Sequence, residues 1–109
     1  MTREFIIVPA FDRRWSDIGL SDDNLRTLQN ELLNNPLSGR IIKDTGGARK
    51  IRFALPGTGK SGGIRVIYLD ITHLNQLYLI LCYPKDKQES LTPTQKKQVK
   101  AVVEALKGV

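Results

Sequence analysis

The chain has almost none of the residues that build disulfides and metal centres. It contains one cysteine, Cys82, and one histidine, His73, among 109 residues. A single cysteine cannot form a disulfide within the chain, and one thiol and one imidazole do not make a zinc site. A catalytic triad would have to recruit His73, which sits in a polar turn with no nucleophile elbow in the sequence. We therefore expect no metal, no cofactor, a reducing compartment and a buried structural thiol at Cys82.

Long apolar runs are missing as well. The N-terminal segment is apolar only from Phe5 to Ala10, and no run approaches the length that crosses a membrane. We expect no membrane association and a cytoplasmic location. The length fits one domain, residues 1–109, with one modest hydrophobic core.

Negative charge is scarce relative to positive charge. Seventeen Lys and Arg residues face eleven Asp and Glu residues, which gives a formal net charge of +6. Such a balance favours polyanionic partners, with nucleic acid first and an acidic protein second. The acidic residues mostly occupy helix starts and turns, where capping explains them, so carboxylate chemistry is not expected.

Apolar periodicity predicts an α+β fold. A strand at 5–8 precedes two helices, one ending at Gly19 and one starting after Ser21, which form a hairpin. Period-two alternation then predicts strands at 49–55, 64–69 and 76–83 in a mostly antiparallel, twisted sheet. Thr92-Pro93-Thr94-Gln95 begins a C-terminal helix.

One glycine-rich segment resembles part of a phosphate-binding P-loop. Gly57-Thr58-Gly59-Lys60-Ser61 matches its end, but Ala54 stands where the first glycine is required, and a strand follows instead of a helix. A hairpin loop is the better interpretation. In that loop Lys60 could lie beside an RNA backbone.

The remaining candidates for chemistry are cationic. They are Arg49, Lys50 and Arg52 on one predicted strand, Lys60 in the loop, Arg65 on the next strand, and Lys85 and Lys87 after Tyr83. Adjacent strands of a meander can bring such residues together on one patch that suits a phosphodiester. Arg65 is the most distinctive because it stands between apolar neighbours, although a snorkelling or salt-bridged edge residue is the alternative.

These segments resemble the RelE superfamily, in its HigB-like branch. The similarity lies in Thr45-Gly46-Gly47-Ala48-Arg49-Lys50-Ile51-Arg52, in Gly59-Lys60-Ser61-Gly62-Gly63-Ile64-Arg65-Val66-Ile67-Tyr68 and in Tyr83-Pro84-Lys85, and it extends over nearly the whole chain. The resemblance implies a toxin of a type II toxin–antitoxin pair. Such a toxin enters the ribosomal A site and cleaves messenger RNA, and its partners would be the ribosome, the message and a cognate antitoxin, acidic or of the helix-turn-helix type. Contact with DNA would arise only through the antitoxin complex.

The resemblance also implies roles for individual residues. The family's catalytic cations fall on Lys50, Arg52, Arg65 and Lys85, while Arg49, Lys60, Tyr83 and Lys87 would bind RNA. The 2′-hydroxyl would attack the adjacent phosphate, and the cations would stabilise the developing charge without a metal. A lysine crowded by other cations loses its proton more easily and could be the general base, and both Lys50 and Lys85 are candidates.

One departure from the family pattern leaves the acid and base assignments open. Members of the RelE branch proper carry a tyrosine beyond the last strand, where this chain has Ser90 and Leu91. Tyr83 is the nearest substitute, either stacking on a base or burying its ring with its hydroxyl in solvent. Two rival functions remain, a gyrase-inhibiting toxin of the ParE type and a non-catalytic module that binds RNA or DNA.

Overall fold

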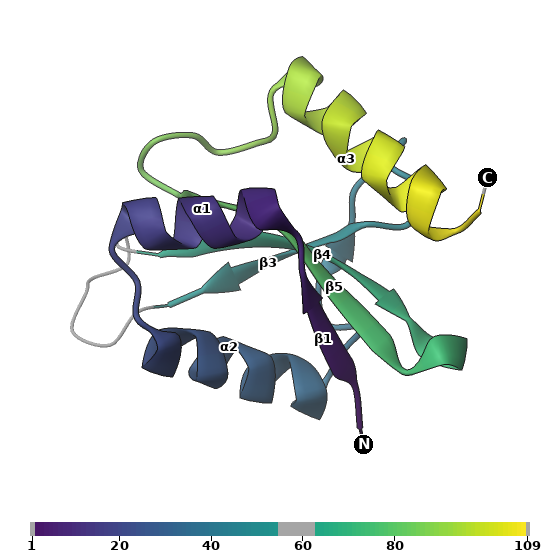
Figure 1. Cartoon of the computed structure of the whole chain (residues 1–109). Coiled ribbons are helices and arrows are strands. Elements are labelled where there is room, and N and C mark those ends of the chain that lie inside the picture. Colours follow the sequence, from purple (N-terminus) through teal and green to yellow (C-terminus); the bar gives the residue numbers. More distant parts are fainter. Residues whose placement is uncertain (1, 55–62, 109) are drawn as a thin grey trace.

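The computed structural model describes residues 2–54 and 63–108 and confirms the α+β prediction. In chain order the elements are β1 (Glu4–Ile7), α1 (Pro9–Ile18), α2 (Asp22–Asn34), β2 (Arg40–Ile41), β3 (Arg49–Phe53), β4 (Ile64–Ile71), the short 3-10 helix η1 (Thr72–Leu74), β5 (Gln76–Pro84) and α3 (Pro93–Leu106). The strands form one sheet in the order β1-β5-β4-β3-β2 (Figure 1). β1 runs parallel to β5, and every other neighbouring pair is antiparallel.

The helix boundaries follow the local chemistry that the sequence predicts. Pro9 begins α1, so the first strand ends at Ile7, one residue earlier than expected. Gly19 ends α1 at φ 91°, a left-handed conformation that glycine adopts without the cost of a Cβ. The Thr92 side chain accepts from the backbone N–H of Gln95, whose own side chain accepts from Thr92, and this capping box starts α3.

The sheet carries a hydrophobic cluster on each face. Val66 and Tyr68 of β4 pack with Leu28 of α2 and with residues of α1, whereas Ile67 packs with Val99 of α3. Successive strand residues point to opposite faces, so α1 and α2 cover one face and α3 covers the other. Figure 1 shows α2 and α3 on opposite sides of the strands.

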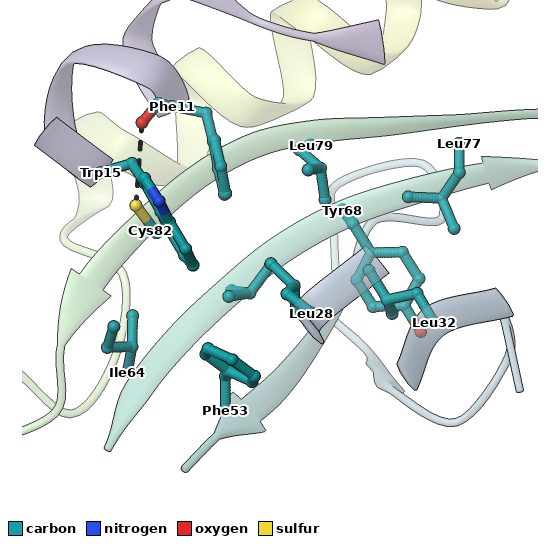
Figure 2. Close-up of a cluster of buried hydrophobic side chains, with 11 residues drawn as sticks. Phe11, Trp15, Leu28, Leu32, Phe53, Ile64, Tyr68, Leu77, Leu79 and Cys82 are labelled. Atoms are coloured by element: carbon teal, nitrogen blue, oxygen red, sulfur yellow. Dashed lines mark hydrogen bonds between the residues drawn. The ribbon is translucent and has the colours of Figure 1, made fainter. Parts of the chain in front are cut away.

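The first cluster is rich in aromatic side chains. Trp15 stacks between Phe11, at 5.5 Å between ring centroids, and Phe53, at 6.1 Å (Figure 2). Cys82 belongs to the same cluster, with its thiol 3.8 Å from the Phe11 carbonyl oxygen (Figure 2). The buried structural role expected for Cys82 is confirmed, and burial raises the pKa of its thiol to about 12.

The segment before β2 is anchored by a buried tyrosine. The Tyr68 hydroxyl donates to the Pro36 carbonyl at 2.8 Å and accepts from the Gly39 N–H at 2.9 Å. A Cβ at Gly39 would lie 2.8 Å from the same hydroxyl oxygen, so the approach requires glycine. These contacts hold the chain so that Arg40 enters the sheet beside β3.

In the part of the chain that the structure describes, no helix is long and apolar enough to span a membrane.

Candidate nucleic-acid interface

A cationic groove of about 500 Å³ lies where β3 and β4 meet the end of α2. It is lined by Glu31, Leu32, Ser38, Arg40, Lys50, Ile51, Arg52 and Arg65. Four of these eight residues are cationic, and they come from three adjacent strands. Three of the cations, Lys50, Arg52 and Arg65, are among the catalytic residues that the sequence predicts.

Strand register explains how these cations meet. Arg52 of β3 is the direct partner of Arg65 of β4, and Lys50 of β3 is the direct partner of Arg40 of β2. Direct partners in an antiparallel ladder place their side chains on the same face, with Cβ atoms about 4.5–5.5 Å apart. Lys50 and Arg52 are two residues apart on one strand and therefore share that face. The four cations thus form a compact cluster.

Arg65 is partly buried in this cluster. Its neighbours in sequence, Ile64 and Val66, are 1% and 0% exposed, as the apolar character of the strand predicts. The Arg65 Nε is buried and has no hydrogen-bond partner in residues 2–54 and 63–108. Because no ion pair to Arg65 is found there either, the salt-bridged alternative has no support in the described chain.

Tyr83 buries its ring, as the second arrangement that the sequence suggested requires, but its hydroxyl is not in solvent. Its side chain is 1% exposed and packs in the cluster that contains Val99 and Leu91, so its ring face is not available to stack on a base. Its hydroxyl is buried rather than in solvent, again with no partner in the described segments. Burial raises the pKa of the Tyr83 phenol, and the charge of Arg65 opposes part of that rise.

Arg49 lies on the face of β3 opposite to Lys50 and Arg52 and is not among the described groove-lining residues. It is the direct partner of Tyr68, and its guanidinium Nη1 donates to the carbonyl of Gly39 at 2.8 Å and to that of Leu37 at 3.2 Å. Alternation along β3 turns Arg49 away from Lys50. This side chain ties β3 to the segment before β2, and the binding of RNA by Arg49 stays a prediction.

Lys85 and Lys87 are not among the described groove-lining residues. Lys85 follows β5, and its backbone N–H donates to the Gly63 carbonyl at 3.0 Å, which extends the ladder at the end of the sheet that carries Arg65. Lys87 is exposed in the segment beyond. Lys60 lies outside the described residues.

The sequence did not point to two charged residues of the groove, Arg40 and Glu31. Arg40 was overlooked because a two-residue strand gives no periodic signal, although its position directly after Gly39 marks the entry into β2. Glu31 was not singled out, because the acidic residues were expected mostly at helix starts and turns, yet it lies in the last turn of α2 and lines the groove. It is the one carboxylate among the described lining residues.

Metal ligands do not gather in the described ranges. No group of three or more His, Cys, Asp or Glu side chains there could hold a metal ion. His73 lies in η1, in the turn that the sequence predicts, at the opposite end of β4 from Arg65.

Comparison with known proteins identifies the family. A structure of a variant of the E. coli toxin RelE in the free state is similar, with a TM-score of 0.60 and 18% identity over 100% of this chain and 99% of that chain. At this identity the likeness shows that the two proteins share a fold. A family model described as the RelE toxin of the RelE/RelB toxin–antitoxin system matches residues 9–109. Because that match covers nearly the whole chain, the protein belongs to the RelE family of toxins.

Proposed function

We propose that this RelE-family toxin is a ribosome-dependent endoribonuclease that cleaves messenger RNA in the A site and so blocks translation. The observation that carries the proposal is the convergence of Lys50, Arg52 and Arg65 on one groove. A phosphodiester gains negative charge as it is cleaved, and fixed cations beside it stabilise that charge more than they stabilise the ground state.

The proposed reaction is a transfer within the RNA. The 2′-hydroxyl gives its proton to a base while its oxygen attacks the adjacent phosphorus. The bond from phosphorus to the 5′-oxygen then breaks, and that oxygen takes up a proton. The products are a 2′,3′-cyclic phosphate and a 5′-hydroxyl end. The positive charge that this step needs would come from Arg52 and Arg65, without a metal.

Lys50 is the better placed of the two lysines proposed as general base. It lines the groove and lies two residues from Arg52, whereas Lys85 is outside the lining set. Lys85 and Lys87 extend the cationic surface beyond β5 and would contact the RNA backbone further from the cut. Arg40, the partner of Lys50 across the β2–β3 ladder, joins the proposed RNA-binding set.

The proposed requirement for the ribosome is consistent with the composition of the groove. Apart from Ser38, the polar residues that line it in the described part of the chain are charged, and charged side chains contact phosphates and carry little information about base sequence. The ribosome would present a single codon in a fixed conformation, so that orientation contributes much of the rate. This action places the protein in the cytoplasm.

The family also implies a cognate antitoxin as partner. We propose that it is acidic where it meets the toxin, or of the helix-turn-helix type, because negative side chains complement the cationic groove. DNA would then be contacted only through the antitoxin complex. Assignment to the HigB-like branch stays a prediction.

Primer extension on a message undergoing in vitro translation tests this function. The expected result is cleavage within A-site codons that requires ribosomes and is lost in Arg65→Ala. Arg26→Ala is the matched control, because Arg26 is an exposed arginine of α2 whose side chain is 72% accessible and contacts Asp23 at 3.5 Å. Intact message with inhibited DNA supercoiling would instead favour the gyrase toxin, and tight RNA binding without cleavage would favour the non-catalytic module.

A further inference from the structure

The strongest unexplained feature of the structure is a pair of buried polar atoms. Arg65 Nε and Tyr83 Oη are both shielded from solvent, and neither has a hydrogen-bond partner in the described part of the chain. Leaving a buried donor unpaired destabilises the fold, so folded proteins seldom do it without a function for that donor.

Among the three tyrosines of the chain, the lack of a hydrogen-bond partner for a buried hydroxyl is particular to Tyr83 in the described residues. The Tyr68 hydroxyl bonds to Gly39 and Pro36, and the Tyr78 hydroxyl donates to the Gln76 side-chain oxygen at 3.0 Å. Tyr83 is 1% exposed, and its hydroxyl has no such partner within residues 2–54 and 63–108.

The two unpaired atoms belong to neighbouring side chains. Arg65 of β4 and Tyr83 of β5 are direct partners in the antiparallel ladder and therefore share a face of the sheet. Arg65 also lines the cationic groove, on the side of β3. The electrostatic effect of Arg65 on the Tyr83 phenol, which lowers its pKa, reflects the same proximity.

The hydrogen-bonding groups of Arg65 and Tyr83 favour an anion as their ligand. A guanidinium Nε–H can only donate, and burial raises the pKa of the phenol, so the Tyr83 hydroxyl keeps its proton at neutral pH. Two donors and one positive charge are complementary to an oxygen that carries negative charge.

We propose that Arg65 and Tyr83 form an oxyanion site between β4 and β5, which binds a non-bridging oxygen of the phosphate to be cleaved. This inference rests on the proposed function and adds Tyr83 to it as a catalytic residue. Tyr83 transfers no proton in this role. Its hydroxyl donates a hydrogen bond that strengthens as the phosphate oxygen gains charge in the transition state.

The test is Tyr83→Phe, with Tyr78→Phe on the same strand as the matched control. Removing a hydroxyl that has no partner in the described residues should leave the melting temperature unchanged or raise it, whereas removing one donor to an oxyanion should slow single-turnover cleavage on the ribosome by on the order of 10²-fold. Tyr78→Phe should cleave at the wild-type rate. Equal cleavage rates for wild type and Tyr83→Phe would overturn the oxyanion site and leave the proposed function standing.

A titration with inorganic phosphate tests the site without RNA. We expect the ¹⁵Nε resonance of Arg65 to shift on addition of phosphate in the wild type, with an affinity several-fold weaker in Tyr83→Phe and in Arg65→Lys. If the wild type cleaves no message, the proposed function fails, and this titration alone decides the site. An affinity unchanged by Tyr83→Phe, or a melting temperature clearly lowered by it, would show that the hydroxyl serves the fold.

Discussion

Arg52 of β3 and Arg65 of β4 lie directly opposite each other in the antiparallel ladder, so two guanidinium groups share one face at adjacent positions. Like charges directly opposite on neighbouring strands are destabilising, and the buried Arg65 Nε has no hydrogen-bond partner in the described residues. An anion bound in the groove would offset both costs, which supports the proposed binding of a phosphodiester.

Replacing Arg65 should lower the cleavage rate without lowering the stability of the fold. In Arg65→Met we expect the free energy of unfolding to stay the same or rise by up to ~1–2 kcal/mol, because the like charge and the unpaired donor are removed. Cleavage should fall by at least about 10²-fold. Urea denaturation and single-turnover cleavage on the same preparation measure both. A variant destabilised by several kcal/mol would indicate that Arg65 is a structural residue.

The salt dependence of RNA binding should show whether each groove cation contacts a phosphate. Lys50→Gln and Arg40→Gln each remove one proposed phosphate contact, so the slope of log K against log salt concentration should fall by about 0.7 for single-stranded RNA. Fluorescence anisotropy with a labelled oligonucleotide between low and moderate salt measures this slope. Arg26→Gln removes the same charge from the outer surface of α2 and should leave the slope nearly unchanged.

Substitution of Arg49 should affect the stability of the fold rather than RNA binding, unlike substitution of its neighbour Lys50. Arg49→Met removes the two hydrogen bonds to the carbonyls of Leu37 and Gly39, and we expect it to lower the free energy of unfolding by ~1–2 kcal/mol. The cleavage rate of the folded fraction should remain close to that of the wild type. Thermal unfolding combined with the cleavage assay distinguishes this from a direct role in RNA binding, which would reduce cleavage without reducing stability.

Stability should fall at alkaline pH because of Cys82. Its thiol ionises near pH 9.0 when unconstrained, and burial raises its pKa in the folded protein to about 12. The neutral thiol is favoured in the fold, so its contribution to stability is complete below pH 9 and is lost as the pH rises from there toward 12. The difference in unfolding free energy between wild type and Cys82→Ala should change in this range by about 1.4 kcal/mol per pH unit. Parallel pH profiles for the two proteins would contradict the assignment, since the tyrosines titrate in both.

The sequence predicted most of the fold because its signals are local. Pro9, Gly19 and the Thr92 cap mark helix boundaries by their own backbone chemistry, and alternation marked β3 and β4. The parallel pairing of β1 with β5 was not foreseen, because it joins segments some 70 residues apart, as the register Glu4 to Gln76 shows.

The site was predicted less completely, because it depends on contacts between elements. Period-two alternation placed Lys50 and Arg52 on one face, and the structure brings both into the groove with Arg65. Alternation alone also shows that Arg49 faces the other way, but its hydrogen bonds to the 37–39 segment require the tertiary fold. The burial of the Tyr83 hydroxyl likewise depends on α3 and the segment before it, which no local pattern reveals.

The most direct test of the central claim is single-turnover cleavage of a message with one modified nucleotide in the A-site codon. Replacing the attacking 2′-hydroxyl by 2′-deoxy or 2′-O-methyl should abolish cleavage at that position while the toxin still binds the programmed ribosome. The unmodified message should yield a 2′,3′-cyclic phosphate and a 5′-hydroxyl, and Arg65→Ala should yield neither. Cleavage of the modified message at an undiminished rate, or an unmodified message left intact by the wild type, would contradict the account.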